Sequence, residues 1–199
     1  MLFFIGQVVS CMSSSTLVDI WQNPTYQAPP LTKMLVISVR KNATKRRIFE
    51  DAFSSDLVKH GVLAISSYSL FPDALPDTDQ VLSTIKTNGF DGVLVIRRLP
   101  TETNKHYVPG YVTTEDNAYP SYWQRYGSYY RELEYPGYID SQAIDIRAID
   151  VSTTGKGGNL IWSATSRTPD PETVVDVQQG IVSLVMSKLE HRGIINSKR

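Results

Sequence analysis

Cys11 is the residue whose type and position are most suggestive of covalent chemistry in this chain. A cysteine thiolate is the nucleophile that proteins use for covalent attachment, metal binding and disulfide exchange. With one cysteine in 199 residues, an intrachain disulfide and a cysteine-based metal cluster are excluded. Two interpretations remain: the thiol is modified by another molecule, or it is a buried or idle cysteine near a frayed amino terminus.

The residues before Cys11 form an apolar run that is too short for a transmembrane helix, which needs about 20 residues. The run fits the hydrophobic core of a secretory signal peptide, although no lysine or arginine precedes it. It ends in Val8, Val9, Ser10 and Cys11, which resembles the lipobox of bacterial lipoproteins. In a lipobox the cysteine receives a diacylglycerol, and the signal peptide is cut just before it. We therefore expect a signal peptide at 1–10 and lipidation of Cys11, with acyl chains such as palmitate.

The residues after Cys11 indicate where such an anchor would hold the chain. Residues 12–15 are a short, mostly polar tether of the kind that follows a lipid anchor. Ser13, and not an aspartate, follows Met12, which gives no inner-membrane retention signal. The expected location is the bacterial cell envelope, facing the periplasm, with the outer membrane favoured. The expected partner at this end is the membrane itself, contacted through the lipid.

Tyrosine is concentrated in one part of the chain, with nine of eleven tyrosines between residues 107 and 138. Tyrosine offers a rigid amphipathic contact surface, which suits the binding of sugars, extended peptides or proteins. We therefore predict a binding surface, with an envelope protein or glycan as partner. Its candidate residues are Tyr107, Tyr111, Tyr122, Trp123, Arg125, Tyr126, Tyr129, Tyr130 and Arg131. Two alternatives remain: a surface extension folded over one sheet edge, or a disordered segment.

The other groups that could do chemistry are scattered. The three histidines are isolated, and His60 and His191 fall in the last turns of predicted helices, where the helix dipole favours a cation. Lys41, Lys45, Arg46 and Arg47 form a basic cluster that we interpret as a solvated face balanced by Glu50 and Asp51, in preference to a phosphate site. The glycine-rich 155–158 lacks the P-loop pattern and indicates a turn. No metalloprotease or serine hydrolase motif is present, so we expect no enzyme, metal or cofactor.

Composition restricts the partner further. Twenty basic and twenty acidic residues give a net charge of zero. Nucleic-acid binding normally requires a clear cationic excess, so we expect no nucleic-acid partner. A hydrophobic fraction of 41% indicates a globular chain, and its length indicates one domain.

Hydrophobic periodicity predicts the elements that position these residues. In the first half, we expect strands at 34–38, 62–66 and 92–97, separated by helices at 43–60 and 77–89. Gly61 and Gly89 end the two helices, and Asp77 with Gln80 forms a capping box. Such a βαβαβ order implies parallel strands. Residues 17–21 could add a further strand.

The second half predicts a β-hairpin and a last helix. Strands at 142–151 and 160–165 flank a turn, with Leu160, Trp162 and Ala164 on one face. Ile149 and Val151 switch faces, which indicates either a bulge or burial on both faces. The helix runs from Asp170 to Gly193. The predicted fold is a single-domain, two-layer α/β sandwich. It consists of a mixed sheet of about five strands and of three helices. Its parts are a signal peptide at 1–10, an anchor and extended lead-in at 11–33, and the α/β domain at 34–199 with a tyrosine-rich insertion at 99–140.

The chain resembles an uncharacterised family of bacterial lipoproteins, a domain of unknown function. The likeness runs from about Leu17 to Ile195. It is carried by Asp19-Ile20-Trp21, Leu35 to Val39, the helix opening Arg46 to Asp51, and Leu160 to Ser163. The resemblance implies an envelope lipoprotein with an α/β sandwich and with Cys11 as its lipobox cysteine. It brings no catalytic residue.

These observations lead to one functional expectation with two alternatives. We expect a cell-envelope lipoprotein that is a non-enzymatic binding or scaffolding module. The alternatives are an envelope hydrolase and a structural subunit of an envelope assembly.

Overall fold

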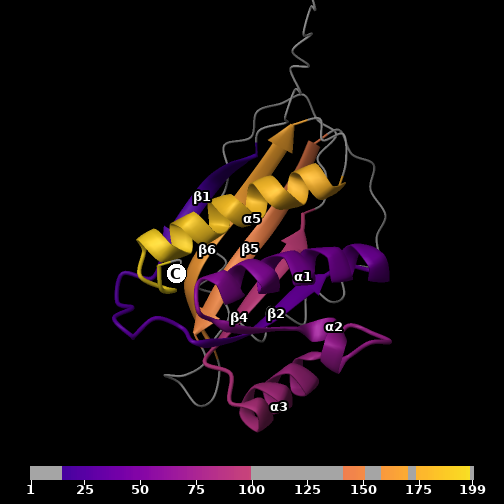
Figure 1. The fold of residues 1–199 in the computed structure, drawn as a ribbon, viewed down its shortest axis with the longest axis vertical. Helices are drawn as coiled ribbons and strands as arrows, with labels where there is room; N and C mark the ends of the chain where they lie inside the picture. The colour runs from indigo at the N-terminus through magenta and orange to yellow at the C-terminus, as the bar shows by residue number, and fades with distance from the viewer. Residues whose placement is uncertain (1–14, 100–140, 151–157, 170–173, 198–199) are drawn as a thin grey trace, which may run out of the picture.

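The protein is a mixed six-stranded β-sheet flanked by helices, seen in a computed structural model that describes residues 15–99, 141–150, 158–169 and 174–197 (Figure 1). The strand order is β1-β6-β5-β4-β2-β3. The strands are β1 (Thr16–Gln22), β2 (Lys33–Val39), β3 (Leu63–Ser66), β4 (Gly92–Arg98), β5 (Ser141–Asp150) and β6 (Asn159–Pro169). β1 is the strand that residues 17–21 predicted, and it lies within the lead-in as one edge of the sheet.

Four helices occur in the described ranges: α1 (Ala43–Lys59), α2 (Ser67–Leu70), α3 (Thr78–Asn88) and α5 (Val174–His191). Three of them are the predicted helices, and α2 is an additional single turn. The capping box of Asp77 and Gln80 is present in both directions. Gly61 and Gly89 follow their helices with φ of 75° and 63°, left-handed values that glycine adopts without a Cβ clash. The predicted ends of α1 and α3 are therefore confirmed.

The sheet is parallel on one side and antiparallel on the other. β3, β2 and β4 are parallel neighbours, whereas β4, β5, β6 and β1 pair antiparallel. The register of β5 against β6 shifts between Ala148 and Ile149, which agrees with a bulge, one of the two predicted alternatives. Leu160, beside this irregularity, packs with the opposite cluster from Trp162 and Ala164, so the prediction that the three share a face is wrong.

The predicted two-layer arrangement is wrong at the parallel end of the sheet, where there are three layers. α1 and α5 pack on one face, in front of the sheet in Figure 1. α3 packs on the other face, against the second core. The cause is the strand order: the crossover through α1 runs from β2 outward to β3, and the crossover through α3 returns past β2 to β4. Because such crossovers are right-handed, opposite directions put their helices on opposite faces.

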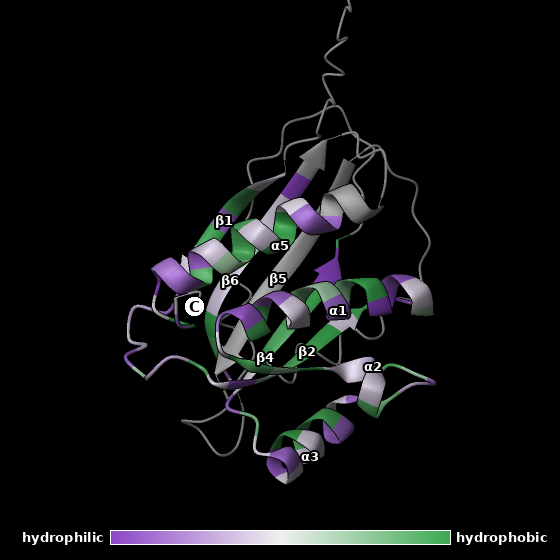
Figure 2. Cartoon of the chain, in the orientation of Figure 1, coloured by the Kyte–Doolittle hydropathy of each residue, from purple (hydrophilic) through white to green (hydrophobic). Residues whose placement is uncertain are grey.

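Two hydrophobic cores result from this arrangement. The larger core joins alternate residues of β2, β4 and β6 to Phe49, Phe53 and Leu57 of α1 and to the apolar stripe of α5. The smaller core joins the intervening residues of β2 and β4 to Val81 and Ile85 of α3. β2 and β4 are thus buried on both faces, which explains their unbroken apolar sequences. Figure 2 shows the hydrophobic colouring along β2.

Candidate anion-binding site

The carboxyl ends of the parallel neighbours β2 and β4 lie side by side, before α1 on one strand and before the segment that leads to β5 on the other. In open α/β sheets, ligands bind outside the carboxyl ends of the strands. Arg40 comes directly after β2, and Arg97 and Arg98 are the last residues of β4. The colouring of β4 changes from hydrophobic to hydrophilic at this end (Figure 2).

Strand alternation places two of these arginines on the same face. The even-numbered residues of both strands face α1 and α5, as Val36 and Leu94 do. Arg40 and Arg98 therefore lie on this face, and Arg97 lies on the face of α3. Because β2 and β4 pair in parallel register, Arg40 and Arg98 occupy neighbouring positions at the ends of the two strands. Adjacent strands are about 4.8 Å apart.

Arg40 is buried without a hydrogen-bonding partner for two of its nitrogens. Its side chain is 8% exposed, and its guanidinium carbon lies 3.9 Å from the centroid of the Phe49 ring on α1. Its Nε and Nη2 atoms are buried and donate no hydrogen bond within the described part of the chain. Burial, and then repulsion from Arg98, lowers the pKa of Arg40 to about 10. Burial also lowers the pKa of Arg98. The cations are therefore held at an energetic cost.

Two serine hydroxyls on the same face are also buried without a partner among the described residues. Ser38 on β2 precedes Arg40 by two positions, and its Oγ makes no hydrogen bond to the part of the chain that the structure describes. Ser166 on β6 lies in the same cross-strand row as Arg98, with Ile144 between them in the pairing, and its Oγ is likewise unpaired. Buried polar atoms are almost always satisfied, so a group of exceptions at one end of a sheet is a candidate site.

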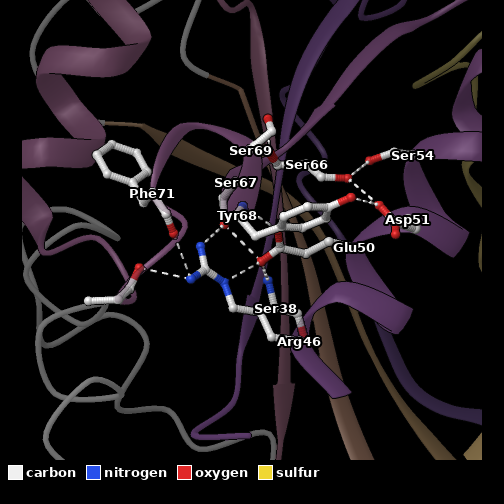
Figure 3. Close-up of polar contacts among 11 residues, drawn as sticks. Ser38, Arg46, Glu50, Asp51, Ser54, Ser66, Ser67, Tyr68, Ser69 and Phe71 are labelled. Atoms are coloured by element: carbon white, nitrogen blue, oxygen red, sulfur yellow. Dashed lines mark hydrogen bonds and ion pairs between the residues drawn. The ribbon is translucent and has the colours of Figure 1, made fainter. Parts of the chain in front are cut away.

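A second buried arginine, Arg46, differs from Arg40 in that every nitrogen of its guanidinium is hydrogen-bonded. Arg46 on α1 donates from Nε to Glu50 at 3.0 Å, from Nη2 to Ser67 at 2.9 Å, and from Nη1 to two backbone carbonyls, those of Phe71 and Ala74 (Figure 3). Its side chain is 5% exposed. The interpretation of Arg46 as part of a solvated basic face is therefore wrong, although its pairing with Glu50 is confirmed.

Glu50 is the central acceptor of this network. Its carboxylate accepts hydrogen bonds from the backbone N–H of Ser38 and Tyr68 and from the hydroxyl of Ser67, in addition to Arg46. The network joins α1 to β2, α2 and the segment that follows α2 (Figure 3). All its charges are paired, so it serves the fold and does not compete for Arg40.

The histidine at the other end of α1 also has a structural role. His60 is 4% exposed, its Nδ1 lies 3.1 Å from the carbonyl of Asn196, and Glu190 of α5 lies 3.7 Å away. It joins α1 to the carboxyl-terminal segment. Within the described ranges, no three histidine, cysteine, aspartate or glutamate side chains gather as a metal site. No helix of those ranges is both long and apolar enough to cross a membrane.

The predicted site residues lie outside the described residues. This applies to Cys11 and to all nine candidates of the tyrosine-rich surface, from Tyr107 to Arg131. The tyrosine-rich segment leaves the sheet after β4 and returns at β5, so its two attachment points are at the end of the sheet that holds Arg40 and Arg98.

Sequence reasoning missed Arg40 and Arg98. One signal could have found them: a buried apolar strand that ends directly in arginine occurs twice, at Val39-Arg40 and at Ile96-Arg97-Arg98. The carboxyl ends of neighbouring parallel strands meet, so both signals fall at one place.

Comparison with known proteins gives a likeness of fold without a family. No protein-family model and no curated protein sequence matches the chain. A leucine-to-methionine variant of the PelC dodecamer from Paraburkholderia phytofirmans is 14% identical with a TM-score of 0.49, over 87% of this chain and 96% of that one. Lipoprotein GNA1162 from Neisseria meningitidis is 12% identical with a TM-score of 0.42, over 79% and 96% of the chains. A DUF4136 family protein from Bacteroides thetaiotaomicron is 12% identical with a TM-score of 0.43, over 91% and 98%. These values describe a general likeness of chain course and imply no shared role.

Proposed function

We propose that this chain is a non-enzymatic lipoprotein of the bacterial cell envelope, whose α/β domain is a binding or scaffolding module. The buried, unpaired Arg40 beside Arg98 is the observation that carries the binding role. An arginine stays protonated at physiological pH, so it is suited to hold an anion and unsuited to act as a general base or nucleophile. The groups gathered at this site therefore favour binding over catalysis.

The anchor is the second part of the proposal. The apolar run that ends in Val8, Val9, Ser10 and Cys11 supports lipidation of Cys11. The described fold begins at Ser15, and β1 starts at Thr16 at the edge of the sheet. The four residues between Cys11 and β1 would keep the domain close to the membrane, in the outer membrane and facing the periplasm.

Metabolic labelling with a fatty acid, followed by membrane fractionation, tests the anchor. Wild type should take up the label and sediment with membranes, whereas Cys11→Ala should lose both properties, because only the thiol accepts the lipid. Met12→Ala is the matched control and should behave as wild type. A wild-type chain without label that remains in the cytosolic fraction would contradict the proposal.

The tyrosine-rich segment is proposed as the contact surface for an envelope protein or glycan. Replacing Tyr126, Tyr129 and Tyr130 by alanine removes three aromatic faces from it. Crosslinked pulldowns with this triple variant should then lose partners of the wild-type protein. The control variant Tyr68→Phe, which changes a tyrosine outside the segment, should retain them. Identical partners in a triple variant of unchanged stability would remove this surface from the proposal.

A further inference from the structure

We propose that Arg40 and Arg98 form a binding site for a phosphate group, carried by a small molecule or exposed on a lipid headgroup. This inference deepens the proposed binding role and does not depend on the anchor at Cys11.

The geometry of Arg40 provides a donor pair that suits an oxyanion. Nε and Nη2, its two unpaired nitrogens, lie on the same edge of the guanidinium and donate in parallel. A phosphate accepts such a pair through two of its oxygens, in the bidentate arrangement for which arginine is preferred over lysine. Arg46 uses the same two nitrogens for Glu50 and Ser67, whereas Arg40 leaves them unused.

The charge at the site fits phosphate better than carboxylate. Two neighbouring guanidiniums carry two positive charges, and neither forms an ion pair with a described carboxylate. Glu50, the buried carboxylate of α1 closest in sequence, accepts its hydrogen bonds from other groups. A phosphomonoester carries about −1.5 to −2 charges near neutral pH and neutralises both arginines, whereas a carboxylate neutralises one.

The surroundings add to the positive potential of the site and leave Arg98 as its accessible side. α1 begins at Ala43 with Asn42 as its N-cap and has no acidic residue in its first turn, so its positive end is three residues from Arg40. Arg40 is 8% exposed, whereas Arg98 is only half-buried. Arg98 is therefore the more accessible of the two guanidiniums and the one that a phosphate group would contact first.

The destabilised cation of Arg40 supports the same assignment. Burial and Arg98 together lower the pKa of Arg40, which means that its cation is destabilised in the folded chain. Bound phosphate would reverse this penalty through two charge-assisted hydrogen bonds. The Phe49 ring, 3.9 Å from the guanidinium, holds the cation in place but offers it no hydrogen-bond acceptor.

Calorimetric titration of the full-length protein with inorganic phosphate at low ionic strength tests the site. Wild type should bind, and Arg98→Met and Arg40→Met should each weaken binding about tenfold or more, because each removes a charge-assisted contact. Arg192→Met removes the same charge after α5, at the other end of α1, and should bind as wild type. Binding should weaken as sodium chloride is added.

Thermal unfolding separates a ligand site from a structural arginine. Without phosphate, Arg40→Met should unfold at a higher temperature than wild type, because it removes a buried unpaired charge and keeps the apolar contact with Phe49. Phosphate should raise the unfolding temperature of wild type and Arg192→Met, compared with chloride of equal ionic strength, and leave that of Arg40→Met unchanged. A lower unfolding temperature for Arg40→Met with an intact phosphate response would overturn the proposal.

Vesicles separate the two sources of the phosphate group. Stronger sedimentation with phosphatidate-containing phosphatidylcholine vesicles than with phosphatidylcholine alone, lost in Arg98→Met, would identify a lipid phosphomonoester. Binding of inorganic phosphate without this difference would identify a soluble one. Absence of both responses would overturn the inference. Cys11→Ala should bind phosphate as wild type does. Failure of the proposed anchor and failure of the proposed phosphate site can therefore be distinguished.

Discussion

Arg40 and Arg46 lie six residues apart and are both buried, at 8% and 4% exposure, yet their surroundings differ completely. Arg46 is satisfied by one carboxylate, one hydroxyl and two carbonyls. Arg40 has an aromatic ring and a neighbouring arginine. A buried charge with partners holds a fold together, whereas one without partners is a cost that a ligand can remove. The two residues illustrate how neighbouring positions of the same type acquire different roles.

The Arg46–Glu50 network gives a first prediction at the residue scale. Glu50→Gln should lower the free energy of unfolding by about 3 kcal/mol, because it leaves Arg46 buried without a counter-charge. Asp51→Asn is the control, since Asp51 is exposed and its contacts with Ser66 and Tyr68 are at the surface. It should cost less than about 1 kcal/mol. Urea denaturation of both variants provides the comparison, and equal losses would contradict the prediction.

Tyr68 gives a prediction for alkaline pH. Its hydroxyl donates to Asp51 at 2.7 Å, and this hydrogen bond, with burial and the charges of Asp51 and Glu50, raises the pKa of Tyr68 above its ordinary value of 10.0. Above pH 10 the unfolded chain loses this proton before the folded chain does, so folding stability contributed by Tyr68 is complete below pH 10 and lost as pH rises further. Unfolding temperatures measured across that range should fall more steeply for wild type than for Tyr68→Phe. Parallel curves would show that the hydrogen bond is not maintained.

At the scale of elements, the start of helix α3 is determined by its own sequence, whereas its position in the fold is determined by the sheet. Asp77 and Gln80 cap its first turn reciprocally, and Asp77→Ala should lower the free energy of unfolding by about 1 kcal/mol. Asp79→Ala is the control: its side chain is exposed in the same first turn, and it should cost less than about 0.5 kcal/mol, the helix-dipole contribution. Chemical denaturation distinguishes the two, and an equal effect would mean that charge matters and the cap does not.

The elements themselves could be predicted because their signals are local. The capping box of α3, the glycines after α1 and α3, and the apolar runs of β2 and β4 each lie within a few residues. The opposite faces of α1 and α3 depend on where β4 inserts relative to β2, and no local pattern contains this. The two-layer prediction failed for that reason.

The candidate site is less predictable than the elements for a related reason. Arg40 follows one strand and Arg98 ends another, 58 residues later by their numbers, and only the register of β2 against β4 makes them neighbours. Tertiary structure also decides whether an arginine has a hydrogen-bonding partner. Arg46 illustrates this, because the sequence predicted a solvated side chain and the structure shows a buried, paired one. Cys11 and the tyrosine-rich surface stay predictions, since they lie outside the described residues.

At the scale of the whole molecule, the segment after α5 closes the fold. Gly193, with φ of 67°, ends the helix, and the N–H of Ile194 returns to the carbonyl of Leu189. The carbonyl of Ile194 then accepts from the N–H of Leu31, which precedes β2, and the carbonyl of Asn196 lies 3.1 Å from Nδ1 of His60. This segment therefore joins the chain before β2 to the ends of α1 and α5.

The side chains of the closing segment predict how strongly the molecule depends on it. Ile195 is 1% exposed and belongs to the larger core, so Ile195→Ala should lower the free energy of unfolding by about 3 kcal/mol through lost burial and an unfilled cavity. Leu63→Ala removes a similar side chain that is 56% exposed and should cost less than about 0.5 kcal/mol. Because α1, α5 and the strand lead-in meet at this segment, the loss should be cooperative, with one urea transition of unchanged slope. A small loss for Ile195→Ala, or a separate early transition, would mean that the carboxyl-terminal segment is an appendage of the core and not its closure.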